Sequence, residues 1–227
     1  MAASRFSAVL FDCDGILVDS EPITQAVLRE MLIELGWDIS EEETIRRFVG
    51  KAFLDEWRVI HEHTGHRIDQ EWILGFRVRR DAALRERLAP VPGAVDAVHA
   101  IAERLPVACV SGADRGKIEM QLEIAGLSDV FGDRVFSGME LPRSKPAPDV
   151  YLAAAGSLGI DSATAAVIED SGSGIAAGIA AGASVFGFAP GGPTYLSAAA
   201  LLRLGVHAVF DSMVELPSLV LDAAAVA

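Results

Sequence analysis

With 227 residues, 51% apolar and 22% charged side chains, the chain has the composition of a globular protein and the length of one or two domains. Its formal net charge is -13, which argues against general binding to nucleic acid or anionic membranes, because nothing offsets the repulsion of phosphate groups. A small anionic substrate stays open, since it needs positive charge only within its site.

The two cysteines, Cys13 and Cys109, are too few for a disulfide framework, and both lie in apolar runs, so we expect them to be reduced. The first residues contain no apolar run long enough for a signal peptide. Residues 171–202 have no charged side chain, but prolines and glycines interrupt them, whereas a spanning helix needs about 20 continuous apolar residues. We therefore expect a cytoplasmic protein without membrane contact.

Short apolar runs alternate with helical patterns along most of the chain. The first run, residues 7–13, has the length and composition of a buried parallel strand. The later runs are 107–110, 135–136, 165–168, 184–188 and 207–210, and the helical patterns between them are 92–104, 115–125, 148–158, 174–181 and 194–204. This alternation predicts an α/β fold with a Rossmann-like, parallel-sheet core.

One long interval, from about residue 22 to 90, breaks the alternation, because it contains only helical patterns. These patterns are 23–35, 41–49, 52–63 and 69–88. The connection after a strand is usually a few residues long, so an insertion of this length is a domain in its own right. We assign 21–90 to an all-helical cap domain and 1–20 with 91–227 to the core domain. The insertion follows the first strand's carboxyl end, where α/β sheets bind ligands, and is placed to act as a lid.

Acidic side chains close two of the predicted strands. Asp12 and Asp14 end the first strand, and Glu169 with Asp170 follows the run 165–168. Unpaired buried carboxylates are costly, but their hard oxygens are the ligands that Mg²⁺ prefers. Because the carboxyl ends of parallel strands lie at one edge of a sheet, we expect the two pairs to converge there.

Two more segments place polar groups beside strand ends or helix starts. Ser111 and Gly112 close the run 107–110, and Lys145 lies between Ser144 and Pro146 in a short loop before a helix. The chain has only three lysines, at positions 51, 117 and 145, so a lysine in such a stiff loop is informative.

Together the four segments resemble the signature motifs of the haloacid dehalogenase (HAD) superfamily of aspartyl phosphotransferases. They follow that family's order: DxDGxLxDSE from Asp12, a serine at the second strand, a KPxP lysine, and an acidic pair followed by Ser and Gly. The resemblance covers nearly the whole chain, with residues 22–90 corresponding to the family's helical cap. It is closest to the β-phosphoglucomutase-like phosphatases, through the KPAPD and EDSGSG segments.

The resemblance implies a catalytic role for several residues. Asp12 is the nucleophile that forms an aspartyl phosphate. Asp14 is the general acid for the leaving alcohol and then the base for the hydrolytic water. Ser111 and the amide of Gly112 hold the transferring phosphoryl group, and Lys145 neutralises the charge shared by Asp12 and the phosphate.

The resemblance also implies a Mg²⁺ site. Its ligands are Asp12, the backbone carbonyl of Asp14, and Asp170, with Glu169 as a direct or water-mediated partner. In the cap, Gly50 and Lys51 lie where caps of this family contact the substrate, so we expect them to bind it.

The implied activity is Mg²⁺-dependent hydrolysis of a small phosphorylated metabolite, with sugar phosphates as one candidate class. Asp14 argues against the dehalogenases and phosphonatases of the superfamily, which lack an acid there. A β-phosphoglucomutase is an alternative. Those mutases have a His ten residues after the second Asp, where this chain has Thr24, and an Arg three residues after a Gly like Gly50, where it has Phe53.

A catalytically silent binding module is an alternative from another class, but such a protein would be expected to lack a catalytic carboxylate, and none is missing. Two weaker patterns are interpreted without a ligand. Residues 112–117 (GADRGK) lack one residue between the glycines of a Walker loop. His61, His63 and His66 have zinc-binding side chains, but we interpret them as the polar face of a cap helix. The sequence indicates neither the individual substrate nor the oligomeric state.

Overall fold

The computed structural model describes residues 5–49 and 56–222. The chain forms two compact units: Met1–Asp19 with Ala89–Ala227, and Ser20–Leu88 between them in sequence. Gly50 and Lys51, together with Phe53, lie outside the described residues. Each unit is described below by itself.

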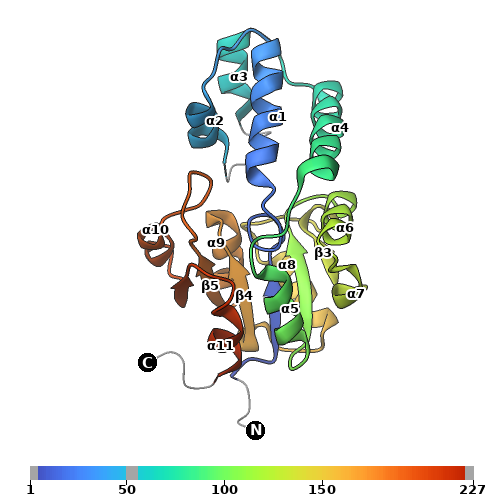
Figure 1. The fold of residues 1–227 in the computed structure, drawn as a ribbon, viewed down its shortest axis with the longest axis vertical. Coiled ribbons are helices and arrows are strands. Elements are labelled where there is room, and N and C mark those ends of the chain that lie inside the picture. The colour runs from blue at the N-terminus through green and yellow to red at the C-terminus, as the bar shows by residue number, and fades with distance from the viewer. Residues whose placement is uncertain (1–4, 50–55, 223–227) are drawn as a thin grey trace. The chain divides into compact units, whose positions relative to one another are not determined.

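A sheet forms the centre of the first unit (Figure 1). It has six strands, in the order β3-β2-β1-β4-β5-β6. Every neighbouring pair is parallel. The strands are β1 (Ala8–Phe11), β2 (Val107–Ser111), β3 (Val135–Ser137), β4 (Ala165–Glu169), β5 (Ser184–Phe188) and β6 (Ala208–Phe210). All six predicted runs are strands, so the α/β parallel-sheet prediction is confirmed.

Helices follow the strands of this sheet. They are α5 (Ala94–Ala102), α6 (Arg115–Ile124), α7 (Ser128–Phe131), α8 (Asp149–Ser157), α9 (Gly172–Ala180), α10 (Ala198–Arg203) and α11 (Leu216–Leu221). The helix predicted from residue 194 begins only at Ala198, because the Ser197 side chain caps it by accepting a hydrogen bond from the Ala200 amide at 3.3 Å.

The central strands are covered on both faces, which explains their unbroken apolar sequences. Every residue of β1, β2 and β4 is buried. Leu10, Val110 and Val167 share one core cluster with side chains of α8, α9 and α10. A parallel sheet buried in this way gives continuous apolar runs rather than alternating ones.

The second unit is helical, as its sequence predicts. It contains α1 (Glu21–Glu34), α2 (Glu41–Phe48), α3 (Trp57–Thr64) and α4 (Gln70–Arg87), with α1 packed against α2 and α4. Its core includes Leu28, Leu32, Ile39, Ile60 and Phe76.

The rings of His61 and His63 hydrogen-bond to backbone carbonyls. The His63 ring nitrogen Nδ1 lies 2.8 Å from the Val59 carbonyl, and the same ring stacks on Trp37 at 3.9 Å. His61 Nδ1 lies 3.3 Å from the His66 carbonyl. In the described part of the chain, none of the three belongs to a group of side chains spaced to hold a metal. Within the same residues, no helix is both long and apolar enough to cross a membrane.

Candidate active site

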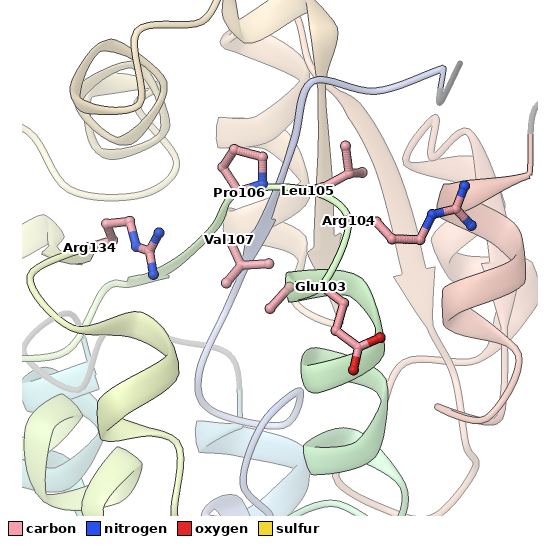
Figure 2. A pocket seen from close by; sticks show the side chains of 7 residues that line it. Glu103, Arg104, Leu105, Pro106, Val107 and Arg134 are labelled. Atoms are coloured by element: carbon pink, nitrogen blue, oxygen red, sulfur yellow. The ribbon is translucent and has the colours of Figure 1, made fainter. Parts of the chain in front are cut away.

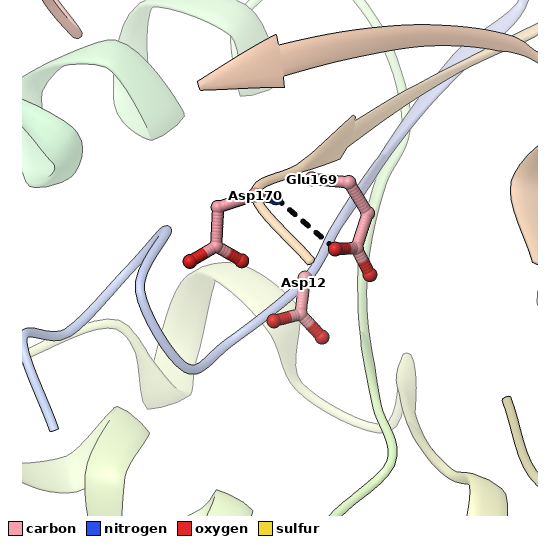
Figure 3. A group of neighbouring side chains, drawn as sticks. All are labelled: Asp12, Glu169 and Asp170. Carbon is pink, nitrogen blue, oxygen red and sulfur yellow. Dashed lines mark hydrogen bonds between the residues drawn. The ribbon is translucent and has the colours of Figure 1, made fainter. Parts of the chain in front are cut away.

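Three carboxylates lie together at the carboxyl ends of β1 and β4 (Figure 3). They belong to Asp12, which directly follows β1, to Glu169, the last residue of β4, and to Asp170. One oxygen from each lies within 4.8 Å of the other two. Asp12 is 6% exposed and Glu169 is fully buried, so these charges are largely withdrawn from water.

Lys145 reaches this group from the loop before α8. Its Nζ donates to Asp12 Oδ1 at 2.6 Å, to Glu169 Oε1 at 2.7 Å and to the Val110 carbonyl at 3.0 Å. Burial raises the pKa of Asp12 to about 7, although the Lys145 ammonium opposes this shift. Burial also disfavours the charge on Lys145, but Asp12 and Glu169 hold its pKa well above the ordinary value. Lys145 is therefore a permanent cation of the site.

Glu169 is the structural anchor of the group. Its Oε1 accepts hydrogen bonds from Lys145 and, at 2.9 Å, from the Tyr151 hydroxyl. Its Oε2 accepts from the Asp170 amide and from both the amide and the hydroxyl of Ser171, at 2.9 to 3.1 Å. These five bonds use the roughly four lone-pair directions that a carboxylate offers. Glu169 is thus better placed to hold Lys145 and the following turn than to bind a cation directly.

The group fits a divalent cation. Three carboxylates face one ammonium, so the cluster has an excess of negative charge that burial makes costly. The donors are all hard oxygens, which suits Mg²⁺. Asp12 and Asp170 are the side chains best placed to serve as direct ligands.

The Asp14 side chain contacts two residues of α6. Its Oδ1 accepts a hydrogen bond from Lys117 Nζ at 2.7 Å and another from Gln121 Nε2 at 2.8 Å. The side-chain oxygen of Gln121, Oε1, in turn accepts a hydrogen bond from the Cys13 thiol at 3.3 Å. The neighbouring Cys109 thiol and burial hold the pKa of Cys13 well above its ordinary value, so the thiol remains a donor.

Ser111 and Gly112 close β2, the strand next to β1. The Ser111 side chain is 1% exposed, and its hydroxyl oxygen accepts a hydrogen bond from the Ala113 amide at 3.1 Å. The hydroxyl proton is still available to donate, because that bond uses only a lone pair.

Comparison with known proteins identifies the family. Residues 6–182 match the family model for haloacid dehalogenase-like hydrolases. The chain belongs to the haloacid dehalogenase-like hydrolases. The resemblance inferred from the four motifs is therefore confirmed.

Several relatives of this HAD hydrolase have named activities. The chain is 31% identical over 188 residues to the 6-phosphogluconate phosphatase of Escherichia coli K12, covering 82% of this chain and 83% of that one. It is 33% identical over 179 residues to hexitol phosphatase B of the same organism, covering 77% and 79%. It is also 34% identical over 182 residues to the chloroplastic protein SUPPRESSOR OF QUENCHING 1 of Arabidopsis thaliana, but spans only 17% of that protein.

Solved structures share the fold. A HAD family hydrolase from Deinococcus radiodurans, crystallised with phosphate and sodium, superposes with a TM-score of 0.78 at 35% identity over 94% of both chains. A putative β-phosphoglucomutase from Thermotoga maritima gives a TM-score of 0.77 at 24% identity, covering 94% of this chain and 97% of that one. The second match supports the fold alone.

Among the residues singled out in the sequence, Asp12, Lys145, Glu169 and Asp170 lie in direct contact or in one carboxylate group. The Asp14 side chain is not one of the three grouped carboxylates and accepts hydrogen bonds from Lys117 and Gln121 of α6. No motif in the sequence predicts a role for the hydrogen-bonding partners Lys117, Gln121 and Tyr151. One signal could have found Lys117: it is one of three lysines and lies in the first turn of a helix, where the helix dipole disfavours a cation.

A separate hollow of about 300 Å³ lies at the amino end of β2 (Figure 2). Asp12 lies at the opposite, carboxyl edge of the sheet. The lining of the hollow includes Arg104 and Arg134. The Arg134 guanidinium donates to the Val130 and Phe131 carbonyls. None of the three grouped carboxylates lines this hollow, so it is separate from the acidic site.

Gly15 has no room for a side chain. Its φ is +78°, and a Cβ at this position would collide with the carboxylate of Asp170. We expect Gly15→Ala to displace the Asp170 carboxylate and to raise the Mg²⁺ concentration needed for half-maximal phosphate release by about tenfold or more. The left-handed backbone at this position should separately lower the free energy of unfolding by about 1–2 kcal/mol. The measurement is phosphate release as a function of Mg²⁺ concentration, with thermal unfolding alongside.

Gly182→Ala is the matched control for this prediction. Gly182 has a φ of +81° but open space where its Cβ would lie, so its alanine variant should lose stability alone. Equal Mg²⁺ requirements in the two variants would contradict the assigned role of the close contact at Gly15.

Proposed function

We propose that this HAD hydrolase is a Mg²⁺-dependent phosphatase that hydrolyses a small phosphorylated metabolite through an aspartyl phosphate on Asp12. The observation that supports this most strongly is the buried contact of Asp12 with Lys145, inside a group of three carboxylates. Phosphatase relatives at 31% and 33% identity support hydrolysis of phosphoric monoesters. The activities of these relatives, together with that of fructose-1-phosphate phosphatase YqaB of Escherichia coli at 29% identity, favour phosphorylated sugars and related polyols or acids as the substrate class.

In the proposed first step, a carboxylate oxygen of Asp12 attacks phosphorus and the bond from phosphorus to the ester oxygen breaks. Asp14 gives a proton to that departing oxygen, so the alcohol leaves neutral. In the second step, water attacks the same phosphorus while Asp14 takes its proton. The acyl phosphate bond breaks, which restores Asp12 and releases inorganic phosphate.

The other residues position charge around this transfer. Ser111 and the Gly112 amide are proposed to donate to the phosphoryl oxygens, and Lys145 to balance the charge on Asp12 and the phosphate. When bound by Asp12, Asp170 and the Asp14 carbonyl, Mg²⁺ would supply further charge stabilisation. This division of roles suits phosphoryl transfer, which depends mainly on positioning and electrostatics.

Wild-type protein is expected to release phosphate from at least one ester in a panel containing 6-phosphogluconate, hexitol phosphates, fructose 1-phosphate and p-nitrophenyl phosphate. EDTA should lower the rate by about 100-fold or more, and added Mg²⁺ should restore it. The measurement is phosphate release with each ester, with and without the chelator.

Absence of release from every ester in the presence of Mg²⁺ would overturn the proposed phosphatase. The mutase alternative makes a different prediction: conversion of β-glucose 1-phosphate only when a bisphosphate primer is supplied. A rate of phosphate release that EDTA leaves unchanged would reject the metal requirement, but the protein would still be a phosphatase.

A further inference from the structure

Two side chains of α6 converge on a single oxygen of Asp14. Lys117 and Gln121 are four residues apart, so they lie on the same face of the helix. Lys117 Nζ is 2.7 Å and Gln121 Nε2 is 2.8 Å from Asp14 Oδ1. Lys117 is 8% exposed and Gln121 is fully buried, so solvent competes little for either bond.

Local structure makes Lys117 an unfavourable residue unless Asp14 accepts from it. It lies in the first turn of α6, where the helix dipole opposes a positive charge. The Asp114 side chain caps this helix by accepting from the Lys117 backbone amide at 3.0 Å. A buried ammonium needs a partner of opposite charge, and Asp14 provides it across 103 residues of sequence.

Gln121 is itself held in one orientation. Its side-chain oxygen accepts from the Cys13 thiol at 3.3 Å, which leaves its amide nitrogen facing Asp14 Oδ1. A hydrogen-bond chain therefore runs from Cys13 through Gln121 to Asp14, and Lys117 meets it at the same oxygen.

We propose that Lys117 and Gln121 are positioning residues for acid–base catalysis, which hold Asp14 Oδ1 so that the proton is given and taken at Oδ2. An oxygen that accepts from two nitrogen donors cannot also donate a proton toward them. In the first step, the Oδ2–H bond breaks and the new O–H bond forms on the departing alcohol, which receives the electron pair of the broken P–O bond. The Lys117 ammonium stabilises the carboxylate charge that then develops on Asp14.

This inference rests on the proposed function, and the leaving group provides its test. An alkyl alcohol needs the proton from Asp14 as its bond to phosphorus breaks. The p-nitrophenolate ion is a stable anion and leaves without one. Loss of positioning at Asp14 should therefore slow cleavage of an alkyl phosphate more than cleavage of p-nitrophenyl phosphate. A merely structural role for Lys117 would slow both reactions equally.

The experiment measures the ratio of two kcat/KM values: the value for glycerol 2-phosphate, or for the best alkyl ester of the panel, divided by the value for p-nitrophenyl phosphate. This ratio reports the steps up to phosphoenzyme formation. We expect Lys117→Met to lower it by about tenfold or more, in the same direction as Asp14→Asn. Lys117→Arg should restore part of the ratio because it keeps the charge. Arg115→Gln is the matched control, since it removes an ion pair between α6 and Glu140 and should leave the ratio unchanged.

Equal losses on the two esters in Lys117→Met, or no loss on either, would overturn the inference while leaving the phosphatase intact. A wild-type protein that hydrolyses neither ester would overturn the proposed function and the inference with it. Circular dichroism establishes whether each variant is folded. If Lys117→Met is not, the same ratio in Gln121→Met decides: an unchanged ratio overturns the inference, and a lowered one supports it.

Discussion

Asp12→Asn is expected to abolish phosphate release, with a fall in kcat of about 10⁴-fold or more. An amide oxygen is a far weaker nucleophile than a carboxylate, and the substitution also removes a charge that faces Lys145 at 2.6 Å. The measurement is phosphate release from the best ester of the panel. Mass spectrometry of rapidly quenched enzyme should detect a phosphoryl adduct in the wild type and none in the variant.

Asp211→Asn is the matched control for the nucleophile. Asp211 follows β6 as Asp12 follows β1, at the same edge of the parallel sheet, but it is exposed. Its variant should retain wild-type kcat. Activity of Asp12→Asn within about tenfold of the wild type would contradict the nucleophile assignment, because loss of a covalent catalyst costs far more than that.

The sheet was predictable because it is parallel and buried on both faces. Such strands, β4 (Ala165–Glu169) for example, consist of unbroken apolar residues, which stand out between helical patterns. The order of the strands was not predictable from those runs. Pairing of β1 with β4, more than 150 residues later, depends on how helices pack across the sheet.

The same parallel geometry made part of the site predictable. Carboxylates that follow β1 and β4 meet because neighbouring parallel strands end at one edge. The partners of Asp14 were not predictable in this way. Lys117 and Gln121 belong to no motif and contact Asp14 only after α6 has packed beside the sheet. The orientation of a side chain at the end of a strand depends on such tertiary contacts, which local sequence patterns do not contain.

Lys145→Met is expected to lower the free energy of unfolding of the metal-free protein by about 3–5 kcal/mol at alkaline pH, because it leaves buried carboxylates without their cation. The loss should be smaller in acid. Burial raises the pKa of Asp12 from 3.8 to about 7, so the folded state binds its proton more tightly than the unfolded state does. The stability that Asp12 contributes to the wild type is therefore lost as pH rises from about 4 to 7, and this contribution changes no further above 7.

In the variant this window extends to higher pH. Lys145 is a cation that lowers the pKa of Asp12, so its removal raises that pKa further and the loss of stability continues above pH 7. In the wild type, Lys145 stays charged at both pH values compared below, since its pKa is held well above the ordinary value. Urea unfolding in EDTA at about pH 5.5 and about pH 8.5 should give the larger difference between wild type and variant at the higher pH.

Two further variants separate charge from packing. Arg143→Met, in the same loop, removes an exposed ion pair with Asp149 and should cost only about 0–1 kcal/mol. Adding Asp12→Asn to Lys145→Met should recover part of the lost stability, because one of the two carboxylates that faced Lys145 is then neutral. An equal loss at both pH values, without recovery in the double variant, would mean that the lysine stem supports the fold by packing. A pH-dependent loss would mean that the buried Asp12 and Glu169 charges are tolerated without a metal because Lys145 lies between them.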